Sequence, residues 1–480
     1  MYRATIVSRK MSETSPPYLH IVRTASKRFE SKRFDIHLTP PPAEEPMGRA
    51  RRTAALLAAL AAVTTGLAAC GSDGSGPAQA SNPTELRLWH YEGPDSAMGV
   101  AWAKAIKEFE STHPGVKVKF EEKSFEQIQK TAPMVLNSND APDIMEYNKG
   151  NATAGLLAKQ GLLTDLTPEV TKRGWDKMLA PALQTTAKYD SSGTMGSGNW
   201  YGVPKYAEFV EVYYNKDMFA RQHIAVPTTF DEFTAAMDKF AKAGITPLAV
   251  GGKEYPAQQY LYELALSKAD RSWVDAYQRY TGKVDFHDTA WSYAANTFKD
   301  WVGKGYVAKN SAGVDAETMG TSFIAGKFPM MVSGTWWYGR LVKEMTKYQW
   351  GTFLWPGNTL NAGSSGNIWV VPKNSKAKQL AYDFINITMQ KDIQQTLVEN
   401  GGVPVAADVS SITDPKNKEL VEEYQKLSQS DGLAFYPDWP VAGFYDTMVS
   451  ETQKLINGSA PPDKVLGDLQ KAYDSGVAGR

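Results

Sequence analysis

The sequence predicts an α/β protein with two domains whose chain passes between them more than once. Three observations support this prediction. Strand patterns and helical patterns alternate from Glu85 onward, give way at Tyr201 to a largely helical stretch, and resume at Asn367. The 411 residues after residue 69 are enough for two hydrophobic cores. No internal repeat is present, so a repeat architecture is not indicated.

The first part of this body has the pattern of parallel βαβ units. Residues 85–90 alternate apolar and polar side chains as a strand does, and residues 100–109 place apolar side chains at helical spacing. A strand at 116–120, a helix at 125–136 and a strand at 143–147 are predicted next. In such sheets, ligands bind at the carboxyl ends of the strands. The first site candidates are therefore the residues at the ends of these strands, His90-Tyr91-Glu92 and Tyr147-Asn148-Lys149. Of these, Tyr91, Glu92, Tyr147 and Asn148 are predicted to bind the ligand.

The second part is predominantly helical. Two extended runs, 201–204 and 210–214, are predicted to meet a turn at 215–217. A Thr-Phe-Asp-Glu capping signal predicts a helix that begins at Thr229. The remaining predicted elements are helices at 257–265, 270–279 and 291–302, a strand at 329–333, a helix from Trp336, a strand at 367–371 and a helix at 376–389.

The only cysteine of the chain, Cys70, ends an apolar run that follows three arginines. A basic segment, a short apolar segment and small residues at the end predict a secretory signal peptide over 47–69. The run is too short for a good membrane-spanning helix. Its final Leu-Ala-Ala-Cys resembles the lipobox of bacterial lipoproteins, which implies lipidation of Cys70; the alternative is a buried free thiol in a helix. Residues 70–83 then predict a flexible tether.

Residues 1–46 precede this signal and show no helical or strand periodicity. Because a signal peptide stands at the N-terminus, we expect translation to start at Met47 and residues 1–46 to be an artefact of the gene model. The intact mass of the unprocessed precursor tests this expectation.

The composition and the motifs of the sequence argue against several classes of function. Residues 70–480 carry 41 Lys and Arg against 47 Asp and Glu, and this interspersed, mildly acidic balance argues against nucleic acid as a partner. One cysteine and scattered histidines make a metal cluster improbable. The motifs of hydrolases, zinc proteases and nucleotide-binding loops are absent. We therefore expect no cofactor, no metal and no catalytic residue.

Four stretches, in order, resemble the family 1 extracellular solute-binding proteins, the carbohydrate-binding subunits of ABC importers. They are residues 141–166, 201–219, 322–341 and 366–389. The resemblance covers roughly residues 84–457 and implies a type II periplasmic-binding-protein-like fold with a ligand cleft between two domains. It implies an N-terminal lobe mainly from 84–200, a C-terminal lobe mainly from 201–365, and a returning segment, 366–480, that completes both.

Site residues follow from the same resemblance. Glu208 matches the sugar-binding glutamate and Trp336 the stacking tryptophan, although either Trp336 or Trp337 could be the one that faces the cleft. The pairs Glu254-Tyr255 and Asp438-Trp439 match an acidic-aromatic loop and the late aromatic segment. After the third strand, Tyr147-Asn148 departs from the pattern of the maltose-binding members.

The resemblance implies a monomeric lipoprotein on the outer face of the cytoplasmic membrane that captures a sugar or oligosaccharide and delivers it to a permease. Sugar rings suit such a site because they offer an apolar face to aromatic side chains and hydroxyls to carboxylates. Two alternatives remain. A secreted glycoside hydrolase or lyase needs paired carboxylates about 5–9.5 Å apart. The same fold could hold a non-sugar solute, but clustered carboxylates or convergent arginines are not evident in the sequence.

Overall fold

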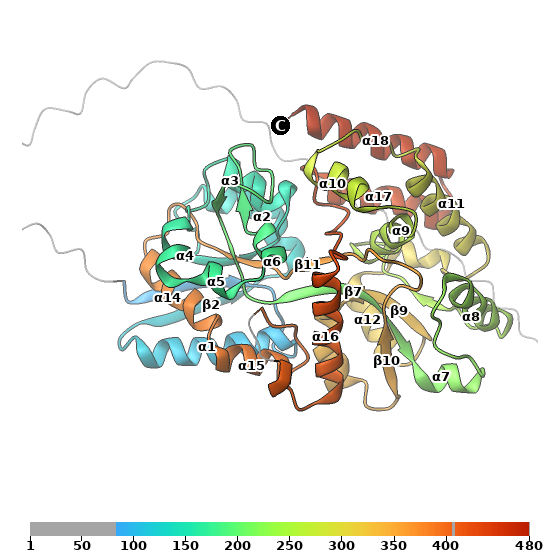
Figure 1. The fold of residues 1–480 in the computed structure, drawn as a ribbon, viewed down its shortest axis with the longest axis horizontal. Coiled ribbons are helices and arrows are strands. Elements are labelled where there is room, and N and C mark those ends of the chain that lie inside the picture. The colour runs from blue at the N-terminus through green and yellow to red at the C-terminus, as the bar shows by residue number, and fades with distance from the viewer. Residues whose placement is uncertain (1–82, 406–408, 480) are drawn as a thin grey trace, which may run out of the picture. The chain divides into compact units, whose positions relative to one another are not determined.

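The computed structural model describes residues 83–405 and 409–479. The expectations for the N-terminal extension, the signal peptide, Met47 and Cys70 lie outside these residues. Figure 1 shows two sheets, each covered by helices, which we call the first and second lobes. Within the described residues, no helix is both long enough and apolar enough to cross a membrane.

The sheet of the first lobe has the strand order β2-β1-β3-β12-β6. Strands β1, β2 and β3 pair in parallel, as predicted, whereas β12 is antiparallel to both of its neighbours. The strands are β1 (Glu85–His90), β2 (Lys117–Glu122), β3 (Ile144–Tyr147), β6 (Val203–Pro204) and β12 (Ile368–Val370).

Serine side chains cap the N-termini of the first two helices of this lobe. The Ser96 side chain accepts a hydrogen bond from the Gly99 amide at the start of α1 (Ala97–Thr112). The Ser124 side chain accepts one from the Gln127 amide at the start of α2 (Phe125–Leu136). The predicted bounds of β1 and α2 agree with the structure. These caps fix where the chain turns at the edge of the sheet, next to the loops that follow β1 and β2.

The sheet of the second lobe has the order β10-β7-β9-β8, with β11 also paired to β7. Its long central strand, β7, is buried along all nine residues. The strands are β7 (Ala207–Asn215), β8 (Leu248–Ala249), β9 (Met330–Gly334), β10 (Trp350–Phe353) and β11 (Gly363–Ser365). A separate ribbon joins β4 (Lys188–Tyr189) and β5 (Asn199–Trp200).

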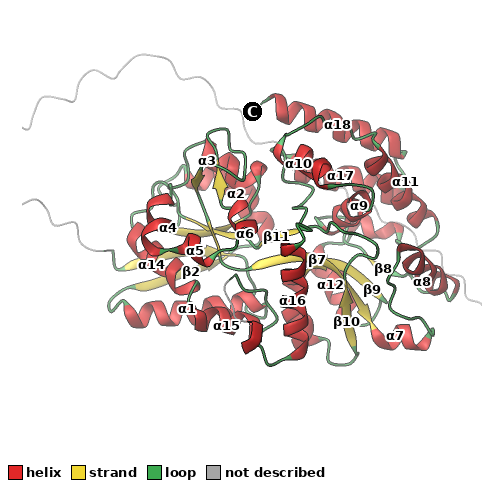
Figure 2. Ribbon diagram, viewed as in Figure 1, coloured by secondary structure: helices red, strands yellow, loops and turns green. Residues whose placement is uncertain are grey.

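Helices surround both sheets (Figure 2). The predicted capping box is present at α8, where Thr229 and Glu232 bond reciprocally. The helices after α2 are α3 (Leu156–Lys159), α4 (Thr167–Arg173), α5 (Trp175–Met178), α6 (Pro181–Thr185), α7 (Lys216–Arg221), α8 (Phe230–Lys242), α9 (Pro256–Leu266), α10 (Arg271–Arg279), α11 (Thr289–Gly303), α12 (Ala316–Ile324), α13 (Tyr338–Glu344), α14 (Lys378–Thr388), α15 (Lys391–Glu399), α16 (Pro415–Gln429), α17 (Phe444–Asn457) and α18 (Pro462–Ala478). Single irregular turns lie at Asn151–Gly155, Lys309–Gly313, Thr335–Trp337 and Val409–Ser411.

The turn predicted at 215–217 is wrong. Asn215 ends β7 and caps α7, because its side chain accepts a hydrogen bond from the Met218 amide. The Asn-Lys-Asp run that suggested a turn is thus a helix start, for which Asn is equally suited.

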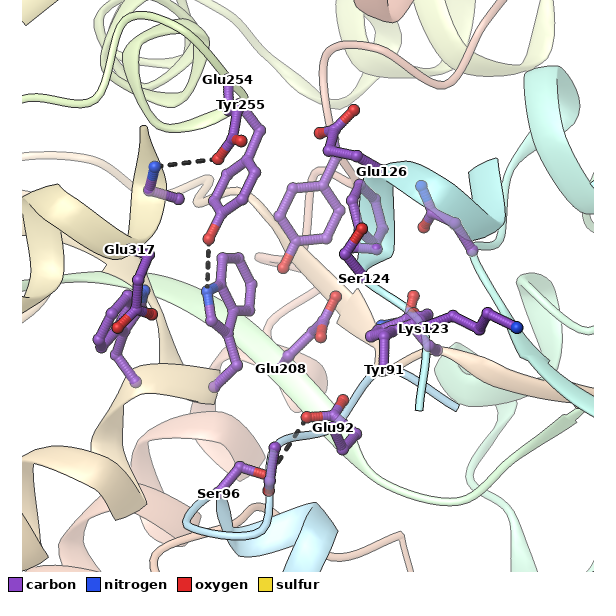
Figure 3. A pocket seen from close by; sticks show the side chains of 18 of the residues that line it. Tyr91, Glu92, Ser96, Lys123, Ser124, Glu126, Glu208, Glu254, Tyr255 and Glu317 are labelled. Atoms are coloured by element: carbon purple, nitrogen blue, oxygen red, sulfur yellow. Dashed lines mark hydrogen bonds between the residues drawn. The ribbon is translucent and has the colours of Figure 1, made fainter. Parts of the chain in front are cut away.

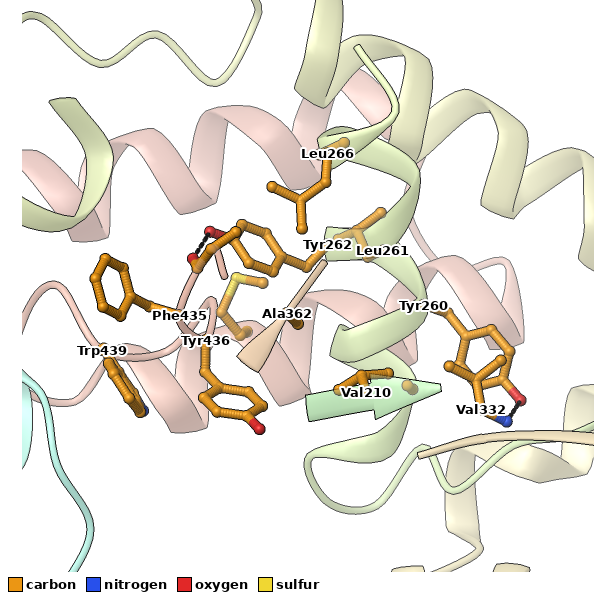
Figure 4. Packing of buried hydrophobic residues seen from close by; sticks show 14 of the residues in the cluster. Val210, Tyr260, Leu261, Tyr262, Leu266, Val332, Ala362, Phe435, Tyr436 and Trp439 are labelled. Carbon is orange, nitrogen blue, oxygen red and sulfur yellow. Dashed lines mark hydrogen bonds between the residues drawn. The ribbon is translucent and has the colours of Figure 1, made fainter. Parts of the chain in front are cut away.

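The chain crosses between the lobes more than once, as predicted. It leaves the first sheet after β6 and enters β7 within three residues, and it returns from β11 to β12 across Gly366 and Asn367. Every residue of α9 is buried, and its Tyr260 and Tyr262 hydroxyls donate to the carbonyls of Ala249 and Ala434. Figure 4 shows this core reaching Tyr436 and Trp439, so the packing of the second lobe fixes the aromatic residues described next.

Candidate functional site

A cavity of about 740 Å³ lies between the ends of the two sheets (Figure 3). The first lobe contributes the loops after β1, β2 and β3, and the second lobe contributes β7, the start of α9 and the turn after β9. The loop before α17 closes one side. Segments far apart in the sequence therefore meet at the carboxyl ends of β1 and β3, where ligands of open α/β sheets bind.

Nine of the ten predicted residues line this cavity. They are Tyr91, Glu92, Asn148, Glu208, Glu254, Tyr255, Trp336, Asp438 and Trp439. Tyr147 does not line it: the side chain is 2% exposed and belongs to the hydrophobic core. The expectation for Tyr147 is not met because this residue is still part of β3, whose buried side chains pack inside the lobe, and the cavity begins one residue later.

The choice between the two adjacent tryptophans is clear in the structure, although both border the cavity. Trp337 is 5% exposed and is part of the hydrophobic core. Trp336 is only partly buried, and its Nε1 donates to the Tyr255 hydroxyl at 3.1 Å. Trp336 thus offers its ring to the cavity, and Trp337 anchors the turn that carries it.

Aromatic rings form a nearly continuous wall. Phe125 of the first lobe lies 6.4 Å from Tyr255, and Tyr255 lies edge-on to Trp336 at 5.7 Å. Tyr436 is 6.2 Å from Trp336 and 5.2 Å from Trp439. Such a wall offers flat apolar faces from both lobes.

Glu208, the predicted sugar-binding glutamate, lines the cavity as one member of a buried ion pair. The side chains of Glu208 and Lys149 are 4% and 2% exposed and form an ion pair. The Lys149 ammonium also donates to Asn367 at 3.3 Å and lies 5.3 Å from the Tyr436 ring. The charge of Glu208 is therefore already compensated, although its carboxylate can still accept hydrogen bonds.

Glu92 lies in a different electrostatic environment. The hydroxyls of Tyr206 and Ser96 donate to its carboxyl group at 3.3 and 3.4 Å. Burial, reinforced by the nearby carboxylates of Glu146 and Glu208, raises the pKa of Glu92 well above its usual range. The charge of Lys205 opposes this shift, and in its protonated form the carboxyl group could donate a hydrogen bond as well as accept one.

A second ion pair, Lys205 with Glu146, lies beneath the cavity at 2.7 Å with both side chains fully buried. Burial lowers the pKa of Lys205 and raises that of Glu146. The attraction between the two groups opposes both shifts. The pair ties β3 to the segment that leaves β6, so it supports the site without entering it.

Of the other first candidates at the strand ends, Lys149 lines the cavity, whereas His90 is buried and does not. Sequence reasoning missed several further lining residues, which carry no local signal: Tyr206, Gln259, Asn367, Tyr436, Glu126 and Tyr445. Among the residues that the structure describes, no group of three or more His, Cys, Asp or Glu side chains is placed to hold a metal ion.

The fold and the cavity define a two-lobed binding protein of the type II periplasmic class. The family model described as "Bacterial extracellular solute-binding protein" matches residues 93–395. Since this match covers more than half of the chain, the protein belongs to that family.

Named relatives extend the comparison. The chain is 26% identical over 343 residues to a probable sugar-binding periplasmic protein of Mesorhizobium japonicum, covering 66% of this chain and 76% of that one. It is 23% identical over 374 residues to the multiple sugar-binding protein of Streptococcus mutans, covering 76% and 84%. A solved chitin oligosaccharide binding protein superposes with a TM-score of 0.69 at 22% identity, covering 82% and 99%.

Proposed function

We propose that this protein captures a sugar or oligosaccharide in the cavity between its lobes. The observation that carries the proposal is a cavity in which aromatic rings and carboxylates from both lobes face one space. Rings stack on the apolar faces of sugars, and carboxylates accept hydrogen bonds from hydroxyls. The names of the relatives support the same class of ligand. A thermal-shift screen against monosaccharides and oligosaccharides tests it, because a ligand of the folded state raises stability.

The sugar is then delivered to the permease of an ABC importer. A ligand that contacts both lobes favours the closed arrangement, which the permease can distinguish from the open one. The protein acts as a monomer, without a cofactor. Small-angle scattering at saturating sugar is expected to show contraction, and an unchanged radius of gyration would contradict closure.

The Trp336→Ala substitution is expected to weaken the binding of every accepted sugar by about 1–3 kcal/mol, because it removes an indole ring that lines the cavity. Titration calorimetry measures the loss. Tyr382→Ala is the matched control, since Tyr382 is a partly buried aromatic residue on α14 that does not line the cavity. Full affinity combined with a collapsed melting temperature would identify Trp336 as a packing residue instead.

The membrane anchor is proposed to be a lipid on Cys70, which lies outside the described residues. Cys70→Ser is expected to abolish lipidation and move the protein from the membrane fraction to the soluble fraction. Fractionation after a carbonate wash, with mass analysis of the mature N-terminus, measures this. Retention of the variant in the washed membrane would overturn the lipobox interpretation.

The protein is proposed to bind sugar without cleaving it. Labelled oligosaccharides incubated with the protein are expected to be recovered intact. Release of shorter products by the wild-type protein would favour the hydrolase or lyase alternative.

A further inference from the structure

The cavity carries a large excess of acidic groups. Of the described residues that line it, eight have carboxylates and three are basic. Each of the three basic side chains is already in an ion pair: Lys149 with Glu208, Arg340 with Glu317 at 2.6 Å, and Lys123 with Glu121 at 2.8 Å. The remaining lining carboxylates thus have no basic partner within the wall of the cavity.

Three of these carboxylates gather at one end. Figure 3 shows Glu126 of the first lobe and Glu254 of the second lobe on the side opposite Glu92. The Tyr445 hydroxyl donates to Glu126, and the Ala316 amide donates to Glu254 at 2.9 Å. Asp438, the third member, is partly buried in the loop before α17.

Charge repulsion links the three groups. Burial, with the neighbouring carboxylates of Glu254 and Asp446, raises the pKa of Glu126. Burial raises the pKa of Asp438 to about 6; the positive charge of Lys149 opposes this shift, and Glu126 adds to it. Glu126 forms a long ion pair with Lys130, one helical turn later. The Lys130 ammonium lies 4.0 Å from the Glu126 carboxylate, and the lysine side chain is 67% exposed. Lys149, the lining cation whose charge acts on Asp438, is already paired with Glu208, so the described residues that line the cavity provide no further basic partner for the cluster.

A separate observation points to a donor from a ligand. Gln259, one helical turn after Tyr255, lines the same cavity and is only 3% exposed. Its Oε1 is buried without a hydrogen-bond partner among the described residues. A buried amide oxygen left unpaired is unfavourable, so the position suits a group that donates hydrogen bonds.

The geometry points to a sugar with a protonated amine, an amino sugar, as the ligand of this cavity. The inference rests on the proposed function and narrows its substrate class. An ammonium donates hydrogen bonds and accepts none, which matches three carboxylates and an amide oxygen. The rings of Tyr445 and Tyr255, which border the cluster, also attract cations. Uronic acids and sugar phosphates are repelled by the same charges.

Three β-1,4-linked series with the same backbone test the inference: oligomers of glucosamine, of N-acetylglucosamine and of glucose. Titration calorimetry with the full chain, from monomer to tetramer, is expected to show glucosamine oligomers binding at least about tenfold tighter than either neutral series. Raising the salt concentration from about 50 to about 500 mM is expected to reduce this preference, because salt screens charges.

The double variant Glu126→Gln, Asp438→Asn is expected to lose most of the preference for glucosamine oligomers, because it removes two of the three carboxylates of the cluster. Asp463→Asn, an exposed carboxylate of α18 outside the cavity, is the matched control and is expected to keep the preference. Equal or tighter binding of neutral oligomers overturns the inference and leaves the proposed function intact. No binding of glucosamine oligomers also overturns it. The wider sugar screen then decides the proposed function separately.

Discussion

Replacing Lys205 by methionine is expected to lower the free energy of unfolding by about 3–5 kcal/mol. The substitution leaves the Glu146 carboxylate fully buried without its cation. It also removes the ammonium that lies 3.9 Å from the Trp369 ring and donates to the Asn367 carbonyl at 3.3 Å. Because these partners sit on β3 and β12, the loss loosens the sheet that carries the cavity loops.

Urea unfolding of the purified variants measures this change. The double variant Lys205→Met, Glu146→Leu is expected to recover most of the stability, since removing both charges ends the desolvation penalty. Lys304→Met is the matched control: Lys304 pairs with Asp300 at 2.8 Å, but both side chains are about half exposed. That control is expected to change stability by less than about 0.5 kcal/mol. Equal losses in the two lysine variants would contradict the role of burial.

Replacing Gly150 by alanine is expected to lower the free energy of unfolding by about 2–5 kcal/mol and also to weaken sugar binding. Gly150 has φ 107° and ψ 167°, a region that essentially only glycine adopts. A Cβ at this position would lie 2.6 Å from Cγ of Trp439. The methyl group therefore pushes the Trp439 ring out of the cavity wall.

Gly161→Ala separates backbone strain from this clash. Gly161 also has a positive φ, 69°, but no atom lies within 4 Å of the place that a Cβ would take there. Its substitution is expected to lower stability by about 1–2 kcal/mol and to leave sugar affinity unchanged. Similar effects of the two substitutions, measured by urea unfolding and calorimetry, would show that contact with Trp439 is unimportant.

Local signals made most of the fold predictable. The limits of β1 and α2 follow from side-chain periodicity and from Ser124, which caps the helix. The direction of β12 could not be predicted in this way. A three-residue apolar strand carries no signal of which strands it will join, and its partners, Met145 and Val203, lie more than 150 residues earlier.

The site was predictable where a residue's position defined its role. Tyr91, Glu92 and Asn148 line the cavity because they follow strands that end at it. The charge relationships were not predictable. Lys149 and Glu208 are 59 residues apart, and their pairing depends on how the two lobes meet.

The acidic cluster escaped prediction for the same reason. Glu126, Glu254 and Asp438 come from three separate parts of the chain, so the sequence showed no clustered carboxylates. Only the packing of α2, the start of α9 and the loop before α17 brings them to one end of the cavity.

The position of β12 also has a consequence for biosynthesis. β3 is the second neighbour of β1, and its other edge is covered only when residues 368–370 pair with it. During synthesis, the first lobe therefore keeps an open strand edge until about three quarters of the chain has been made. The first sheet cannot be completed early, because β12 follows every strand of the second sheet in the sequence. The first lobe can therefore reach its final fold only after most of the chain is available.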